Sequence, residues 1–200
     1  CGRYYPERVD DVAWENDLTA FRAYGPALQE TGERAFGYDI WTKYNTTEPV
    51  VEARYEGELN PDMKAKIAEL GKTDPKAAQE LYRSVSYHVD HGNGLDCYKV
   101  GPTLGGGTTA LMAGDTIVYP YCYATQEILD NGPLRFTVKL VYNPLVVKGD
   151  STIIETRIIT LDAGSYCNKT VVSYTNLKET MPLAVGIVLH EPDRSEEHTS

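Results

Sequence analysis

Hydrophobic and polar residues alternate along much of this chain with a period of two, which is typical of β-strands that are buried on one face. Residues 17–26 form the first such stretch, which ends at a Gly-Pro pair. One face of this strand would carry Leu18, Ala20, Arg22 and Tyr24, and the other would carry Thr19, Phe21 and Ala23. A second strand is predicted over residues 38–44.

Helical spacing replaces this alternation between residues 60 and 85. Asn60 followed by Pro61 is a typical helix start, because asparagine caps free backbone N–H groups and proline suits the first helical position. Apolar residues then recur at helical spacing up to Gly71, which should end the helix. Asp74 and Pro75 repeat the same start. We therefore expect a short helical insertion around residues 60–85.

The strand pattern returns after residue 105. Residues 105–120, 134–142, 151–175 and 183–189 are rich in apolar and β-branched residues and contain Gly, Pro and Asp turns, one of them at 162–165. One face of the segment 134–142 would carry Phe136, Val138, Leu140 and Tyr142. Several strands at close spacing predict a mostly β protein, built as an antiparallel sandwich.

Composition limits the partners of this sandwich. The chain has 200 residues, of which 42% are hydrophobic, and it carries a formal net charge of −10. That content of apolar residues supports a buried core. The acidic charge and the lack of a basic run argue against nucleic acid as a partner. No apolar stretch is long enough to predict a membrane span. An anionic substrate would need local Arg or Lys groups.

The ends of the chain affect which residues enter the fold. We expect one β-sandwich domain over residues 1–193, truncated at both ends, because the chain starts with Cys1 rather than Met. Residues 194–200 resemble the translation of a sequencing-library adapter. They are expected to be an artefact, and His198 is therefore left out of the candidate site.

Four cysteines are spread along the chain at positions 1, 97, 122 and 167. None forms a Cys-x-x-Cys pair, which argues against a thiol redox centre or a zinc knuckle. One or two disulfides are compatible with an exported protein, and free buried thiols are equally compatible with the sequence.

Candidate proton carriers gather in the segment 86–102, SYHVDHGNGLDCYKVGP. His88 and His91 stand three residues apart, and the glycines at 92 and 94 favour a turn that would bring their rings together. Asp90 or Asp96 could orient a ring or complete a divalent metal site. A direct acid or base role is the preferred interpretation, and a metal site or structural hydrogen bonding are the alternatives.

Further candidates lie in this segment and on the two strands nearest the N-terminus. Tyr98 or Lys99 could face the site, and Tyr98 is the preferred proton carrier of this pair. Arg22, beside Tyr24, could bind a carboxylate or sulfate through two parallel hydrogen bonds. An internal ion pair between Arg22 and Asp17 or Glu15 is the favoured alternative. Trp41 and the abundant tyrosines could serve as platforms on which sugar rings stack.

The blocks PERVDDVAWENDLTAFRAYGPAL, YHVDHGNGLDCYKVGPTLGGGT and NGPLRFTVKLVY closely resemble the DUF4861 family over residues 4–190. The resemblance implies a β-supersandwich related to mutarotase-like and polysaccharide-lyase folds. It also implies a periplasmic, secreted or outer-membrane-associated protein of a polysaccharide-degrading bacterium, often of the Bacteroidota. The family includes an oligosaccharide dehydratase that acts in ulvan breakdown and forms an unsaturated uronic acid at the non-reducing end.

The resemblance therefore predicts a lyase or dehydratase that removes water from the terminal uronic acid of an oligosaccharide, without an obligatory cofactor. This chemistry needs a neutralised carboxylate, a base and an acid. His88, His91 and Tyr98 are the candidates for proton transfer. Arg22 and Lys99 are the candidates for charge neutralisation, and Tyr24 and Trp41 for further contacts with the sugar. A non-catalytic sugar-binding sandwich and a metal-dependent sugar hydrolase or epimerase are the alternatives.

Overall fold

The computed structural model describes residues 1–190 and shows three antiparallel sheets and four α-helices within them. The predicted adapter segment 194–200, with His198, lies outside the described residues. The helices and the short 3-10 turn are η1 (Pro6–Arg8), α1 (Pro26–Glu30), α2 (Val51–Leu59), α3 (Pro61–Thr73) and α4 (Pro75–Arg83).

The first sheet has the strand order β1-β2-β3-β4 and uses β1 (Gly2–Tyr5), β2 (Asp11–Glu15), β3 (Thr19–Ala23) and β4 (Asp39–Thr42). The second sheet has the order β11-β10-β8-β7, and β9 also pairs with β10. Its strands are β7 (Tyr123–Asn131), β8 (Arg135–Tyr142), β9 (Leu145–Val147), β10 (Asp150–Asp162) and β11 (Lys169–Thr175). The third sheet has the order β12-β5-β6, with β5 (Gly106–Ala113), β6 (Thr116–Val118) and β12 (Leu183–Ile187).

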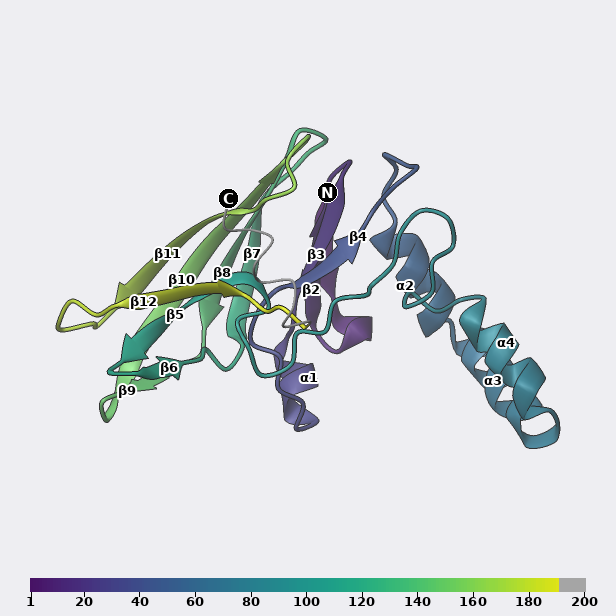
Figure 1. Cartoon of the computed structure of the whole chain (residues 1–200), viewed down its shortest axis with the longest axis horizontal. Coiled ribbons are helices and arrows are strands. Elements are labelled where there is room, and N and C mark those ends of the chain that lie inside the picture. The colour runs from purple at the N-terminus through teal and green to yellow at the C-terminus, as the bar shows by residue number, and fades with distance from the viewer. Residues whose placement is uncertain (191–200) are drawn as a thin grey trace.

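The first and third sheets lie on the same side of the second sheet and form a sandwich with it (Figure 1). The main core lies between the first and second sheets and is centred on Trp14, whose ring is stacked on Phe136 with centroids 6.2 Å apart. A smaller core joins Leu111 of β5 to Ile153 of β10. The antiparallel sandwich predicted from the sequence is therefore confirmed.

The first and third sheets meet where Tyr38 and Gly105 form a parallel bridge. Gly105 has a φ of +56°, and a Cβ atom there would lie 2.6 Å from the carbonyl oxygen of Tyr38. Only glycine fits this combination of a left-handed backbone and a close approach. Gly105 therefore allows the first and third sheets to join side by side, next to β4 and β5, into one layer that faces the second sheet.

The opposite face of the first sheet is covered by α2 and by the loop that follows α4. Tyr5, Trp41, Tyr55 and Tyr87 are packed together there, and Trp41 is stacked on Tyr87 with ring centroids 5.3 Å apart. This aromatic layer separates the sheet from solvent. It also surrounds a buried polar cluster, which forms one wall of the candidate site.

The helical insertion predicted around residues 60–85 is confirmed by α3 and α4, which extend away from the sheets (Figure 1). The Asn60 side chain accepts a hydrogen bond from the backbone N–H of Met63, and Asp74 caps α4 in the same way. Helix α3 continues past Gly71, where the sequence pattern predicts its end, to Thr73, and it packs against α4. Within residues 1–190, no helix is both long and apolar enough to cross a membrane.

Several strands differ from the prediction in detail. The segments 17–26 and 38–44 form shorter strands, β3 and β4, and the last strand ends at Ile187 rather than at residue 189. The alternation itself is confirmed, because Phe21 faces the main core while Arg22 faces the opposite side. Likewise, the face of β8 that was predicted to be apolar is buried. The sequence pattern missed β1, β2, β7, β9, α1 and α2.

We predict that Gly105→Ala destabilises the protein more than Gly164→Ala. Both glycines have a positive φ, but a Cβ atom at Gly164 would meet nothing within 4 Å. The shared backbone strain should cost about 1 kcal/mol in each variant, and the clash with Tyr38 should add about 1–3 kcal/mol in Gly105→Ala alone. Denaturant unfolding of the two variants measures this difference. Equal losses of stability would mean that the meeting of the two sheets does not depend on Gly105.

Candidate functional site

The loop between α4 and β5 is held against β4 like an additional strand. Thr42 donates its backbone N–H to the carbonyl oxygen of Leu95 at 3.0 Å, and Trp41 and Asp96 form an antiparallel bridge. Gly94 has a φ of +111°, and a Cβ atom there would lie 1.9 Å from the carbonyl oxygen of Thr42. The glycine in the predicted segment is therefore needed for close contact with the sheet, and this contact fixes Asp96.

His88 is oriented by Asp96. Its Nδ1 atom lies 3.1 Å from the backbone carbonyl oxygen of Asp96 and 3.7 Å from the carboxylate Oδ2 of the same residue. Because a carbonyl oxygen only accepts hydrogen bonds, Nδ1 carries the proton, and Nε2 has a free lone pair in the neutral ring. The side chain is 54% exposed, and Nε2 has no hydrogen-bond partner among residues 1–190. The geometry thus leaves a solvent-accessible base.

Arg22 lies at the centre of the buried polar cluster beside this loop. Its Nη2 group is paired with Asp39, which lies directly opposite on β4, and donates to Asp96 at 2.7 Å. Nη1 donates to the hydroxyl of Tyr55 at 3.3 Å and lies 3.9 Å from Asp11. The internal ion pairs expected for Arg22 are present, but the partners are not Asp17 or Glu15. Those residues lie elsewhere: Glu15 is paired with Lys43, and Asp17 accepts from Gly164.

Burial raises the pKa of two of the carboxyl groups around Arg22. Desolvation raises the pKa of Asp11 to about 7, although Arg22 and Arg8 oppose the shift. Burial also raises the pKa of Asp39, again against the effect of Arg22. A buried carboxylate has no water around it and is stabilised only by its protein partners, so the protonated form is favoured when several carboxylates share one cation. The charge of Arg22 is therefore used by the carboxylates around it.

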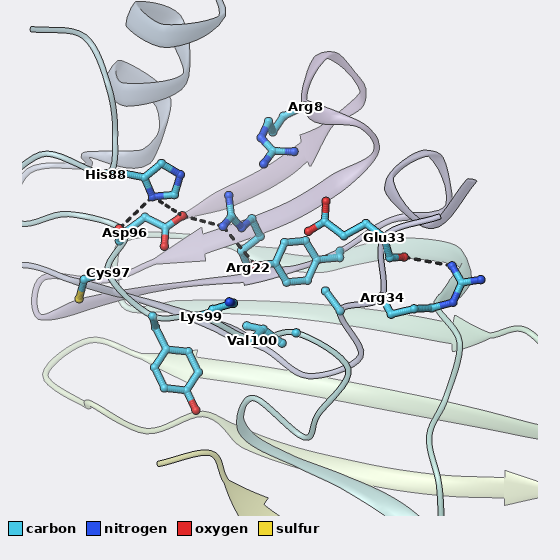
Figure 2. A pocket seen from close by; sticks show the side chains of 13 residues that line it. Arg8, Arg22, Glu33, Arg34, His88, Asp96, Cys97, Lys99 and Val100 are labelled. Atoms are coloured by element: carbon cyan, nitrogen blue, oxygen red, sulfur yellow. Dashed lines mark hydrogen bonds and ion pairs between the residues drawn. The ribbon is translucent and has the colours of Figure 1, made fainter. Parts of the chain in front are cut away.

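A pocket of about 440 Å³ opens beside this cluster, in the size range typical of small-molecule sites. Figure 2 shows His88, Asp96 and Arg22 on one side of it and Glu33 and Arg34 on another. The lining residues are Arg8, Arg22, Tyr24, Glu33, Arg34, Ala35, His88, Asp96, Cys97, Tyr98, Lys99, Val100 and Gly101.

Cationic side chains dominate this pocket although the whole chain has a net charge of −10. Lys99 is exposed and has no hydrogen bond or ion pair within the part of the chain that the structure describes. Arg8 donates to the hydroxyl of Tyr87 at 3.1 Å and lies 3.8 Å from Asp11. The local charge is therefore suited to an anionic ligand, as electrostatic complementarity requires.

The pocket brings together five of the seven candidate residues. His88 and Lys99 present free polar atoms there, whereas Arg22 and Tyr24 bond to each other at 3.2 Å. Tyr98 also lines the pocket, but its hydroxyl donates to the carbonyl oxygens of Gly105 and Val188. Burial also raises the pKa of Tyr98, which disfavours the ionised form that a base needs. These contacts are typical of a structural residue.

The other two candidates, His91 and Trp41, lie outside the lining. His91 bonds through Nε2 to the carbonyl oxygen of Ser86 at 2.9 Å and thereby closes its own turn. Trp41 is only 2% exposed, because its face of β4 is covered by α2 and Tyr87. This burial corrects the expectation that Trp41 stacks on a sugar. Its indole N–H instead donates to Asp39 at 2.9 Å.

Sequence reasoning missed Arg8, Glu33 and Arg34, which also line the pocket. They lie in η1 and in the loop after α1, and neither segment carries a periodic pattern. An acidic residue followed by a basic one, as at Glu33 and Arg34, is too common in sequences to indicate a functional site. Only the folded chain brings these residues beside His88.

The structure bears on two alternatives left open by the sequence, a metal site and disulfides. Within residues 1–190, no three His, Cys, Asp or Glu side chains gather as a metal site requires. All four cysteines are free thiols, with Cys122 buried and the other three exposed. Of the two cysteine arrangements compatible with the sequence, the structure shows the unpaired one.

We predict that Asp11 makes the stability of the fold depend on pH. A carboxyl group whose pKa is raised in the folded state stabilises the fold fully below its unfolded pKa, near 4, and this contribution is lost as the pH rises through about 7. Asp11→Asn should remove this part of the decrease between pH 5 and pH 8. Chemical denaturation at both pH values measures it, and one pKa unit corresponds to about 1.4 kcal/mol.

Asp115→Asn, at an exposed turn between β5 and β6, is the matched control for loss of one carboxylate. If Asp11→Asn and Asp115→Asn retain the same pH dependence as the unaltered protein, the buried Asp11 carboxyl does not titrate in this range.

Comparison with known proteins agrees with the family suggested by the sequence blocks. "Uncharacterized protein P7" of Formosa agariphila is 29% identical over 196 residues, which cover 94% of this chain and 43% of that protein. The chain thus spans less than half of the length of this relative. No solved structure matches the chain. The model of the family described as "Domain of unknown function (DUF4861)" matches residues 1–200, and the chain therefore belongs to the DUF4861 family.

Proposed function

We propose that the protein is a carbohydrate-active lyase that eliminates water from the terminal uronic acid of an oligosaccharide, in the pocket that contains His88. One observation supports this function above the others. An accessible histidine with one free ring nitrogen shares a pocket with unpaired or partly paired cations. An elimination next to a carboxylate needs these two elements together.

The substrate carboxylate is assigned to Lys99, with Arg8 as the second cation. A proton on the carbon next to a carboxylate is only weakly acidic, and a positive group beside that carboxylate stabilises the charge that develops when the proton leaves. Arg22 is less suited to this task than the sequence indicates, because its guanidinium already serves Asp39 and Asp96. In this proposal Arg22 holds the wall of the pocket, and Lys99 binds the ligand.

His88 is assigned as the base. The carbonyl oxygen of Asp96 fixes the tautomer of the neutral ring in which Nε2 is unprotonated and can accept a proton. In the proposed step Nε2 takes the proton at C5, the C4–O bond breaks, and a C4–C5 double bond forms. The departing hydroxyl takes up a proton from a general acid or from solvent and leaves as water, and the electron pair of the C–H bond becomes part of the double bond.

The family resemblance supports the substrate class and a periplasmic, secreted or outer-membrane-associated location in a polysaccharide-degrading bacterium. The pocket supports an anionic ligand but does not select ulvan-derived sugars over other uronic acids. A non-catalytic sugar-binding sandwich would use the same cations without chemistry at His88. Turnover and binding must therefore be measured separately.

We predict that His88→Ala abolishes an elimination activity that His91→Ala retains. The test incubates the protein at its full natural length with uronic-acid-terminated oligosaccharides, ulvan-derived ones included. Ultraviolet absorbance reports the conjugated double bond, and mass spectrometry reports the loss of one water. Loss of the base should lower turnover by about 100- to 10,000-fold, whereas sugar binding should remain measurable.

His91→Ala is the matched control, because His91 lies three residues away and does not line the pocket. Binding without any absorbance change by the unaltered protein would favour the sugar-binding alternative. Equal activity of both variants would remove His88 from the chemistry.

A further inference from the structure

Elimination of water needs a second proton transfer, because hydroxide is a poor leaving group and must be protonated as it departs. His88 cannot supply that proton in the same step in which its Nε2 atom takes one from carbon. In a concerted elimination, a second group must therefore present a free polar atom to the pocket. This requirement rests on the proposed function.

Most of the other proton carriers in the pocket are engaged. Asp96 is 3% exposed and paired with Arg22. Tyr24 is held by the same guanidinium, and burial raises its pKa. The hydroxyl of Tyr98 is bonded to backbone groups on both sides. Burial also raises the pKa of the Cys97 thiol, and its neighbour Asp96 adds to that shift.

Glu33 differs from these residues. It lines the same pocket, it is exposed, and its carboxylate has no hydrogen bond or ion pair within residues 1–190. Figure 2 shows its side chain across the pocket from His88, with its carboxyl group on the side of Arg8. A base and an acid on different sides of one pocket can act on neighbouring carbons of one sugar ring.

The loop that carries Glu33 is fixed in place by its neighbours. Gly32 has a φ of +92°, which turns the chain sharply after α1. Arg34 then donates to the backbone carbonyl oxygens of Gln29 and Glu33, and its guanidinium lies 5.1 Å from the ring centroid of Tyr121. The buried Gln29 side chain holds Ala35 through a 3.0 Å hydrogen bond. The anchors on both sides thus hold Glu33 at the pocket.

We propose that Glu33 is the general acid of the elimination. The proton at C5 goes to Nε2 of His88 while the C4–O bond breaks, and the departing hydroxyl takes the proton of the Glu33 carboxyl group to leave as water. The electron pair of the C–H bond becomes the C4–C5 double bond.

The decisive experiment changes both the leaving group of the substrate and the residue at position 33. A uronic acid glycoside with fluorine in place of the C4 hydroxyl loses fluoride, which departs without a proton. Turnover of the C4-hydroxyl and C4-fluoro substrates is compared in the unaltered protein at full natural length and in Glu33→Gln. Glu33→Gln should slow loss of water by about 100- to 10,000-fold and keep loss of fluoride within about tenfold.

Two control variants separate chemistry from structure. Glu30→Gln removes an exposed carboxylate at the end of α1 that does not line the pocket, and it should leave both rates unchanged. His88→Ala should slow both substrates, since each requires removal of the same proton from carbon.

Each outcome decides between the proposals. If Glu33→Gln slows both substrates equally, or slows neither, Glu33 is not the general acid, and the proposed function of the site still stands on the unaltered protein. If the unaltered protein acts on neither substrate, the proposed elimination itself is wrong, and the role of Glu33 is overturned with it. If Glu33→Gln slows the reaction of the C4-hydroxyl substrate but not that of the C4-fluoro substrate, the result supports Glu33 as the general acid.

Discussion

The guanidinium of Arg22 neutralises carboxylates that come from three separate parts of the chain, and the local structure depends on this contact. Asp11 lies on β2, Asp39 on β4 and Asp96 in the loop before β5. Each carboxylate is almost fully buried, and without a cation their burial would be strongly unfavourable. The charge of Arg22 thus holds the loop on the sheet and, through Asp96, orients the ring of His88.

This arrangement divides the cations of the pocket into two groups. Arg22 is buried and saturated by protein groups, so it gives the site shape rather than affinity. Lys99 is exposed and unpaired among the described residues, so its charge is available to a ligand. In a protein with a net charge of −10, such a local reversal of sign both attracts an anion and limits where it binds.

Local patterns predict the parts of the fold that depend on neighbours in sequence. Alternation placed Phe21 and Arg22 on opposite faces of one strand, and the caps at Asn60 and Asp74 marked two helices. The partners of Arg22 could not be predicted, because Asp39 and Asp96 reach it only through strand register and the docking of a loop.

The burial of Trp41 was missed for a related reason. Its face of β4 is covered by α2, a helix that the sequence pattern does not mark clearly. A tryptophan on a strand can serve equally well as a sugar platform or as a core residue. Only the groups that cover the ring decide between these roles, and they come from α2, which begins ten residues later in the chain, and from Tyr87 in a still later loop.

Burial also separates structural polar groups from chemically available ones within a single pocket. Tyr24, Tyr98 and Asp96 are partly or fully buried, and their polar groups are bonded to protein partners. His88 and Glu33 lie on loops, where the backbone is held but polar side-chain atoms are free. A group that exchanges protons with a substrate must be held in position without being satisfied. In this pocket, the free atoms of His88 and Glu33 meet that condition, and both side chains depend on buried residues for their positions.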